Sequence, residues 1–266
     1  MSKARVSDIA KILNEIYPPE LAQEWDVNGL NLGSENKVVN KILFSVDVTK
    51  AVVDEAVREK VDLIISHHPL MLRPLSLLPE ESLKGGLITT LIKEDIAVFN
   101  THTNADAAKN GVNQALASLL NLSDSKPINE TGIGRIGRLT NPIKLREFVD
   151  FVKHILPKTN SLILVSGDLE KAIKTVAVCG GAGDSLLAEV RELEVDVYLT
   201  SDLRHHPAQD NKEMNGPALI SVSHWASEWP WLSACQTDLS RELTKAGFNV
   251  EMKISEINTD PWDAAI

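Results

Sequence analysis

The sequence predicts an α/β fold made of two copies of one strand–helix–strand unit. Short apolar runs alternate with amphipathic stretches along most of the 266 residues, a pattern typical of α/β proteins. Two segments offset by 134 residues resemble each other, as in an internally repeated chain. Between them lies a polar, glycine-rich stretch without clear periodicity, which indicates a junction.

The expected strands are short apolar runs, and the expected helices carry apolar residues at helical spacing. Apolar runs predict strands at Lys41–Val46, Leu63–Ser66, Ala97–Thr101, Leu162–Val165, Val176–Cys179, Val197–Thr200 and Ala218–Val222. Amphipathic stretches predict helices at Val6–Ile16, Lys50–Glu59, Val112–Leu120, Ile143–Ile155, Asp184–Glu192 and Leu232–Lys245.

The repeat is clearest between Lys41–Pro69 and the segment that begins at Lys174. At an offset of 134 residues, the matched pairs are Glu55 with Glu189, Val61 with Val195, and Asp62 with Asp196. Each copy also contains a His-His-Pro triplet, at His67-His68-Pro69 and His205-His206-Pro207. Chance agreement between similar α/β segments is the alternative explanation.

A second match follows later in each copy. His102 and Asp106 are spaced like His224 and Glu228, and a predicted strand precedes each pair. Each copy therefore ends a strand in a His-x-x-x-acid sequence, and this placement of histidines supports duplication more strongly than the apolar matches do.

The stretch Asn121–Arg138 is expected to join two lobes, because it is polar and then rich in glycine. We place the boundary near residue 125. The first lobe then spans 1–125 and the second 126–266, with a C-terminal segment that could return to the first lobe.

The composition indicates a soluble globular protein of the cytoplasm. Hydrophobic residues make up 43% of the chain and charged residues 24%, and the net charge is −10. An acidic surface disfavours nucleic acid and anionic membranes as partners. No apolar run approaches the roughly 20 residues that span a bilayer, and the N-terminus lacks the apolar core of a signal peptide. The two cysteines indicate no disulfide framework.

Three groups of residues are candidates for chemistry. His67 and His68 follow a buried strand, where α/β proteins place functional groups. Asp106 lies in the loop after another strand, and His224 and Glu228 share one face of a short helix because they are four residues apart. Taken singly, each group has an ordinary explanation. His67 and His68 could be hydrogen-bonded polar residues at a strand end, Asp106 could cap a helix, and His224 and Glu228 could be a surface pair.

Taken together, these residues predict a metal site. Three imidazoles and two carboxylates are too many for one tetrahedral structural zinc, and no thiolate is among them. They suit two divalent ions that share a bridging carboxylate or water, with Zn, Mn, Fe or Co as candidates.

Weaker signals have bland explanations that we favour. The glycine-rich Cys179–Asp184 could hold phosphate, but a tight strand-to-helix turn explains it better. Arg135 and Arg138 could meet an anion, although a solvated pair is the simpler reading. His205 and His206 could form a second metal pair, and we favour structural or supporting roles for them.

Short motifs are spread along nearly the whole chain. They are Trp25-Asp26-Val27-Asn28-Gly29-Leu30, Val46-Asp47-Val48-Thr49, Ser66-His67-His68-Pro69, Asn100-Thr101-His102-Thr103-Asn104-Ala105-Asp106, Gly134-Arg135-Ile136-Gly137, Cys179-Gly180-Gly181-Ala182-Gly183, Tyr198-Leu199-Thr200-Ser201-Asp202, His224-Trp225-Ala226-Ser227-Glu228 and Asp260-Pro261-Trp262. In combination they resemble the GTP cyclohydrolase I type 2 family, also known as the NGG-one-interacting-factor-three-like proteins.

The resemblance implies two interlinked α/β lobes with mixed sheets flanked by helices, a dinuclear metal site between the lobes, and ring-shaped homohexamers. Its motif positions transfer the metal ligands to His67, His68, Asp106, His224 and Glu228. Two departures are visible: Val27 and Asn28 are exchanged relative to the usual order, and Ser201 stands where glycine is usual. The 266 residues leave no room for the domain that longer members insert.

The family name implies a metal-dependent hydrolase that acts on a nucleotide or a related phosphorylated heterocycle. His102 is the candidate for proton transfer, since histidine suits acid–base work near neutral pH. As the counterpart of His224, it could instead be a sixth ligand. The alternative function is a non-enzymatic metal-binding ring that acts as a sensor, regulator or scaffold. Trp225, Trp229 and Trp231 could line a pocket, form a subunit contact or fill the core.

Overall fold

The structure is a computed structural model that describes residues 3–266. Its internal contacts divide the chain into two compact units. Unit 1 comprises residues 3–108 and Leu232–Thr259, and unit 2 comprises Lys109–Trp231 and Asp260–Ile266. Both units are therefore discontinuous in sequence.

Unit 1 is built on a five-stranded sheet in the order β13-β4-β5-β6-β2. The three central strands are parallel, β13 joins β4 in parallel, and β2 joins β6 antiparallel. The elements are β1 (Ala4–Arg5), α1 (Val6–Ile16), η1 (Pro19–Leu21), β2 (Gly29–Leu32), β3 (Val38–Val39), β4 (Lys41–Ser45), α2 (Lys50–Arg58), β5 (Leu63–Ser66), α3 (Leu83–Lys93), β6 (Ala97–Asn100), α4 (Thr103–Ala107), α10 (Pro230–Lys245) and β13 (Glu251–Ile254).

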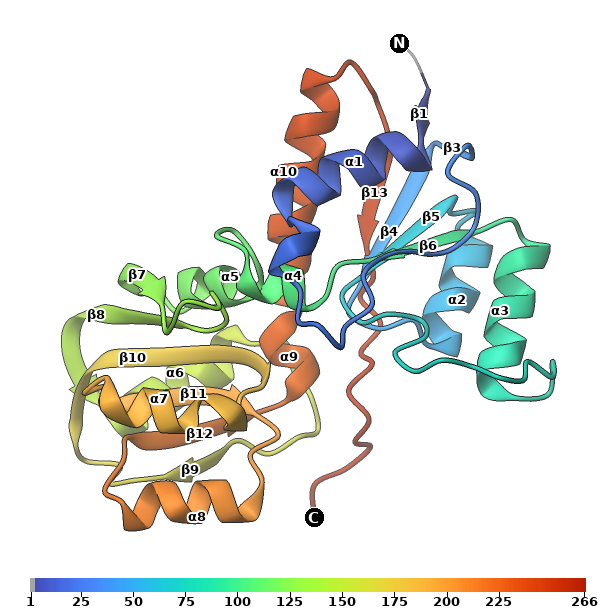
Figure 1. Cartoon of the computed structure of the whole chain (residues 1–266). Coiled ribbons are helices and arrows are strands. Elements are labelled where there is room, and N and C mark those ends of the chain that lie inside the picture. Colours follow the sequence, from blue (N-terminus) through green and yellow to red (C-terminus); the bar gives the residue numbers. More distant parts are fainter. Residues whose placement is uncertain (1–2) are drawn as a thin grey trace. The chain divides into compact units, whose positions relative to one another are not determined.

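Helices cover both faces of this sheet, as buried parallel strands require. Helices α2 and α3 pack on one face over Leu43, Ile64 and Val98. Figure 1 shows α1 and α10 on the other side, where the alternate strand residues Phe44 and Ile65 point. The core strands are thus buried on both faces, which leaves their ends as the accessible positions for polar groups.

Unit 2 is built on a six-stranded sheet in the order β7-β8-β10-β11-β12-β9. Strands β10, β11 and β12 are parallel, whereas β7, β8 and β9 are antiparallel to their neighbours. The elements are α5 (Val112–Leu119), β7 (Ser123–Pro127), β8 (Arg135–Lys144), α6 (Leu145–Ile155), β9 (Leu164–Ser166), β10 (Ala172–Ala182), η2 (Asp184–Leu186), α7 (Leu187–Glu192), β11 (Val197–Ser201), α8 (His205–Glu213), β12 (Ala218–Val222) and α9 (His224–Glu228).

The two units repeat one topology. The order β4-β5-β6-β2 in unit 1 corresponds to β10-β11-β12-β9 in unit 2, with three parallel strands and an antiparallel edge strand in each. The helices follow in the same order, so that α2, α3 and α4 correspond to α7, α8 and α9. The α/β fold of pseudo-repeated units with mixed sheets is therefore confirmed.

The contact-based division falls at residue 108, whereas the sequence-based boundary lies near 125. Strand β7 pairs with β8, and this pairing attaches the intervening segment to unit 2. Strand β13 pairs with β4 and so brings the segment Leu232–Thr259 into unit 1. The division into lobes 1–125 and 126–266 stays a prediction.

Most predicted elements are present. The predicted α1, β5 and β12 have the observed bounds. The predicted helix at Ile143–Ile155 begins at Leu145, because residues 143 and 144 end β8. Throughout the described residues 3–266, no helix is long and apolar enough to cross a membrane.

Candidate metal centre

His67 and His68 lie at the carboxyl end of β5, the central strand of unit 1. Their backbone N–H groups donate to Ser45 O at 3.1 Å and to Val46 O at 2.9 Å, which continues the pairing with the chain after β4. The two imidazole rings nevertheless lie close, with centroids 5.0 Å apart. The side chains of these adjacent residues are thus available to the same site.

Each of these two rings is oriented through its Nδ1 atom. In the fully buried His67, Nδ1 lies 3.1 Å from Thr101 O. In His68, Nδ1 lies 2.7 Å from Asp47 Oδ1, a carboxylate just after β4. An oxygen acceptor at Nδ1 fixes the proton there and leaves the lone pair of the neutral ring on Nε2.

His102 joins them from the end of β6, where it is the residue before α4. Its ring centroid lies 5.1 Å from that of His67 and 5.4 Å from that of His68. One ring nitrogen from each of the three histidines lies within 4.8 Å of the others. The Nδ1 atom of His102 lies 2.7 Å from Asp26 Oδ1. This trio of imidazoles is a group that could hold a metal ion.

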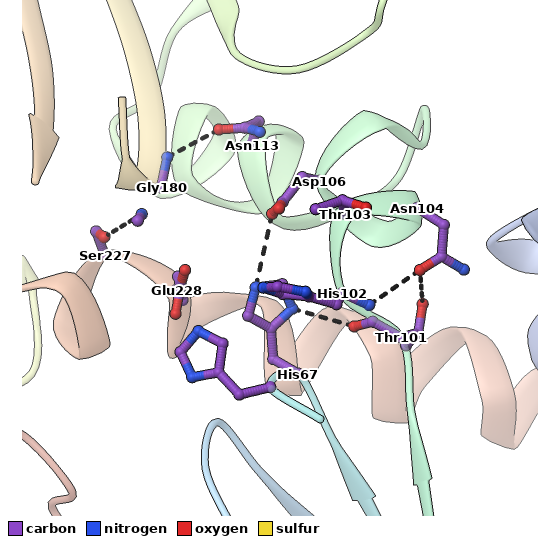
Figure 2. A network of polar contacts seen from close by, with 12 residues as sticks. His67, Thr101, His102, Thr103, Asn104, Asp106, Asn113, Gly180, Ser227 and Glu228 are labelled. Atoms are coloured by element: carbon purple, nitrogen blue, oxygen red, sulfur yellow. Dashed lines mark hydrogen bonds and ion pairs between the residues drawn. The ribbon is translucent and has the colours of Figure 1, made fainter. Parts of the chain in front are cut away.

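Asp106 lies on α4, one helical turn after His102, and its Oδ1 is 3.7 Å from His67 Nε2. Figure 2 shows the carboxylate directed at that ring. The capping role considered for Asp106 alone is wrong, because His102 holds the N-cap position and Asp106 lies inside the helix. The carboxylate faces the imidazole cluster instead.

In unit 2, His224 and Glu228 form the corresponding pair on α9. Ser223 caps this helix by accepting a hydrogen bond from Ala226 N. The four-residue spacing places His224 Nε2 3.0 Å from Glu228 Oε1, and His224 Nδ1 lies 2.6 Å from Asp202 Oδ2. The Glu228 carboxylate, opposed by burial and aided by Asp202, raises the pKa of His224 to about 11.

The glycine-rich end of β10 lies against this pair. Gly181 has φ +70°, and its N–H donates to Ser227 Oγ at 2.9 Å. A Cβ at this position would collide with Glu228 Oε1 and would lie 3.2 Å from His224 Nε2. The glycine is therefore required for the close approach of Glu228. Most of the segment Cys179–Asp184, which we expected to be a tight turn, is the end of β10, and only Gly183 separates that strand from η2.

Three carboxylates that orient the histidines were not singled out by sequence reasoning. Asp26, Asp47 and Asp202 contact the Nδ1 atoms of His102, His68 and His224. Two of them stand at the ends of buried strands. Asp202 directly follows β11, and Asp47 follows β4 with one residue between them. This position at a strand end was the signal available in the sequence.

The weaker candidates lie outside these clusters. His205 and His206 begin α8 and are exposed, and neither belongs to a group of three possible ligands among residues 3–266. Arg138 is exposed as we expected, but Arg135 is buried, and its Nη1 donates to Gly132 O and Gly134 O. Trp225 and Trp231 are buried, which agrees with the core alternative.

The two departures from the family motifs are accommodated locally. Asn28 Oδ1 accepts the backbone N–H of His102 at 2.7 Å, and its amide donates to Asp26 Oδ2 at 2.9 Å. Val27, its partner in the exchange, is half exposed. Ser201 places its Oγ 3.2 Å from Ser227 Oγ. Asn28 and Ser201 thus both take part in local hydrogen bonds.

Fold and site together define an α/β protein of two repeated units whose strand ends carry imidazole and carboxylate groups able to hold a metal. The profile of the family described as Duf34/NIF3 (NGG1p interacting factor 3) matches residues 4–261. The chain belongs to this family.

Relatives and solved structures agree with this assignment. The chain is 40% identical to a GTP cyclohydrolase 1 type 2 homolog of Streptomyces coelicolor, with 98% of this chain and 95% of that protein covered. It is 33% identical to the protein of the same name from Clostridium perfringens, with 97% and 99% covered. A Staphylococcus aureus hypothetical protein of known structure has a TM-score of 0.92 at 27% identity, with 99% and 100% covered.

Proposed function

We propose that this protein is a metal-dependent hydrolase that acts on a nucleotide or a related phosphorylated heterocycle. In this proposal, two divalent ions are held by His67, His68, Asp106, His224 and Glu228. The ligand set combines three residues of unit 1 with two of unit 2, and the ions would be Zn, Mn, Fe or Co.

One observation carries the proposal: each of the three ligand histidines has an oxygen acceptor at Nδ1. Metal-ligating histidines usually donate their second ring N–H to a carboxylate or carbonyl, which fixes the ring and raises its basicity. Cys179 and Cys235 are buried, form no disulfide and belong to neither group of possible metal ligands, so imidazole and carboxylate remain as the donor types. These donors fit borderline divalent metals.

When bound, such ions supply Lewis-acid polarisation of the scissile C–N or ester group and acidify water. The residues of the chain would divide the remaining work. The five ligands fix the reacting groups in place, and Glu228 neutralises positive charge. His102 lies beside the unit 1 ligands with its ring oriented by Asp26, so it can accept and return a proton.

Turnover of a nucleotide panel tests this function. Protein stripped of metal and reloaded with Zn, Mn, Fe or Co should hydrolyse at least one nucleotide. Asp106→Ala should abolish this turnover, whereas His154→Ala should retain it, because His154 is an exposed residue of α6. Equal activity in wild type and Asp106→Ala would contradict the proposed hydrolase.

The nucleotide panel also distinguishes the proposed hydrolase from the alternative function, a metal-binding ring that acts as a sensor or scaffold. That alternative keeps the same ligands but predicts tight metal binding without turnover of any nucleotide. Both functions are compatible with a homohexamer, which we propose from the family resemblance. Light scattering should give about six times the chain mass of 29.2 kDa. A monomer at micromolar concentration would rule out the ring.

A further inference from the structure

The side chain of Asp26 is enclosed by hydrogen-bond donors and is 0% exposed. Its Oδ1 accepts from Val27 N at 2.8 Å and from His102 Nδ1 at 2.7 Å. Its Oδ2 accepts from Asn28 Nδ2 at 2.9 Å, from Thr103 N at 2.9 Å and from Thr103 Oγ1 at 2.5 Å. Five donors on one buried carboxylate hold it ionised and in a single orientation.

The backbone of His102 is fixed as firmly as its ring. Its N–H is shared between Asn28 Oδ1 at 2.7 Å and Asn104 Oδ1 at 2.9 Å. Asn104 Oδ1 also accepts a hydrogen bond of 3.0 Å from the hydroxyl of Thr101 (Figure 2). The loop that carries Asp26 and the loop that carries His102 are thus joined by several bonds, although 76 residues separate these two residues.

This arrangement determines where the imidazole proton lies. An ionised carboxylate can only accept, so His102 must carry its proton on Nδ1. The lone pair of the neutral ring is then on Nε2. The rings of His67 and His68 lie within 5.4 Å of the His102 ring, centroid to centroid.

We propose that Asp26 is a positioning residue that fixes His102 as the Nδ1–H tautomer and thereby makes Nε2 the proton acceptor of the reaction. This rests on the proposed hydrolase. As water attacks the scissile atom, its O–H bond breaks and the proton passes to Nε2, while the oxygen electron pair forms the new bond. The imidazolium returns that proton to the leaving nitrogen or oxygen, and Asp26 stabilises its charge in between.

The variant Asp26→Asn tests the proposal because it reverses the tautomer. Its amide nitrogen must face either the two donors at the Oδ1 position or the three at the Oδ2 position. The first choice creates fewer clashes between donors and places N–H against His102 Nδ1. That atom must then accept, and the proton moves to Nε2. The same reversal is the reason that a carboxylate-to-amide change disables an Asp–His pair in serine proteases.

Asp62→Asn is the matched control. Asp62 Oδ2 likewise accepts several bonds, from Asn40 N, Asn40 Nδ2 and Lys41 N, at the opposite, amino end of the same sheet. This substitution perturbs a comparable carboxylate without touching His102. A loss of activity caused by general destabilisation would therefore appear in both variants.

The measurements are solid-state ¹⁵N NMR of histidine-labelled, zinc-loaded protein, with the His102 signals assigned by comparison with His102→Ala, and steady-state kinetics. Wild type and Asp62→Asn should show protonated Nδ1 and unprotonated Nε2, and Asp26→Asn the reverse. kcat should fall about 100-fold in Asp26→Asn, as for loss of a general base, with little change in KM.

Three results would overturn the proposal. They are a protonated Nε2 in wild type, a zinc-bound shift at Nε2 that makes His102 a sixth ligand, and wild-type kcat in an Asp26→Asn protein with the reversed tautomer. The wild-type spectrum tests the predicted tautomer of His102 even if Asp26→Asn does not fold. The spectrum also does not depend on turnover, so a protein without hydrolase activity but with the expected tautomer would refute the proposed function separately.

Discussion

Asp62 and Asp196 accept matching backbone hydrogen bonds in the two units, although 134 residues separate them. Asp62 Oδ2 accepts the N–H groups of Asn40 and Lys41, and Asp196 Oδ2 accepts those of Lys174 and Thr175. The backbone of each aspartate also bridges two strand starts, through bonds to the preceding and the following parallel strand. Apolar matches between two α/β segments could arise by chance, but matching backbone hydrogen bonds at the aligned position support duplication.

Asp62→Ala and Asp196→Ala should therefore destabilise the protein by similar amounts. Each substitution removes the acceptor for two backbone N–H groups at a strand start. We expect a loss of about 1–3 kcal/mol in the free energy of unfolding for each variant. Urea titration followed by circular dichroism provides the measurement. A large loss in one variant and none in the other would argue against equivalent roles.

His224→Ala should remove most of the metal-dependent rise in melting temperature. A ligand that binds only the folded chain stabilises it by RT ln(1 + [L]/Kd), roughly 2.7 kcal/mol at a hundredfold excess over Kd. Melts of wild type, His224→Ala and His154→Ala, with and without chelator, test this. His154→Ala should behave as wild type. If chelator lowers the melting temperature of wild type and His224→Ala equally, His224 is not a ligand.

Metal affinity should rise with pH well above the ordinary imidazole pKa of about 6.5. Glu228 raises the pKa of His224 to about 11. In the metal-free protein at neutral pH, this ring is therefore an imidazolium with protons on both nitrogens. Ligation requires neutral imidazole and must release one of these protons. The apparent Kd should then fall about tenfold per pH unit from this residue alone.

The folding stability of the metal-free protein should change with pH in the opposite direction to its metal affinity. A pKa raised on folding stabilises the folded state below the unfolded pKa of about 6.5, and this contribution declines as pH rises toward 11. Chelated protein should thus lose stability between about pH 6.5 and 11, whereas metal-saturated protein should not, because its His224 ring is neutral in both the folded and the unfolded chain over that range. Calorimetric titrations in buffers of different ionisation enthalpy should report proton release at pH 7. No release would contradict the raised pKa.

Gly181→Ala should weaken metal binding by displacing the Glu228 carboxylate. Gly247→Ala is a suitable control, since Gly247 has a similar φ of +80° but no atom within 4 Å of an added Cβ. Both variants should lose about 1–2 kcal/mol of stability through backbone strain. Only Gly181→Ala should also lose metal, as measured by elemental analysis after dialysis. Equal metal content in both variants would show that Gly181 does not position Glu228.

The sequence predicted the buried parts of the fold well, because fully buried strands appear as continuous apolar runs. Leu63–Ser66 is an example, as its residues are all buried. Strand β7 was missed because its residues are mostly exposed and polar. Helix α3 was missed because Gly85 and Gly86 lower helix propensity, and α8 because His205-His206-Pro207 begins a helix with only one buried residue.

The site was predictable to the extent that its residues stand together in sequence. His67 and His68 are adjacent, and the spacing of His102 and Asp106 matches that of His224 and Glu228. The carboxylates that orient these rings come from other strand ends. Asp26 acts on a ring 76 residues away, and no local pattern records that pairing. Only the folded sheet brings the two loops together.

The discontinuity of unit 1 has a consequence for its biosynthesis. On the ribosome, β4, β5 and β6 emerge long before β13, which follows the whole of Lys109–Trp231 in the chain. Until Glu251–Ile254 arrives, β4 is an open edge that can pair with another nascent chain. Unit 2 has its complete sheet by Val222 and can fold first. Chaperone dependence should therefore concentrate on the first-made half of the protein, which is the last to be completed.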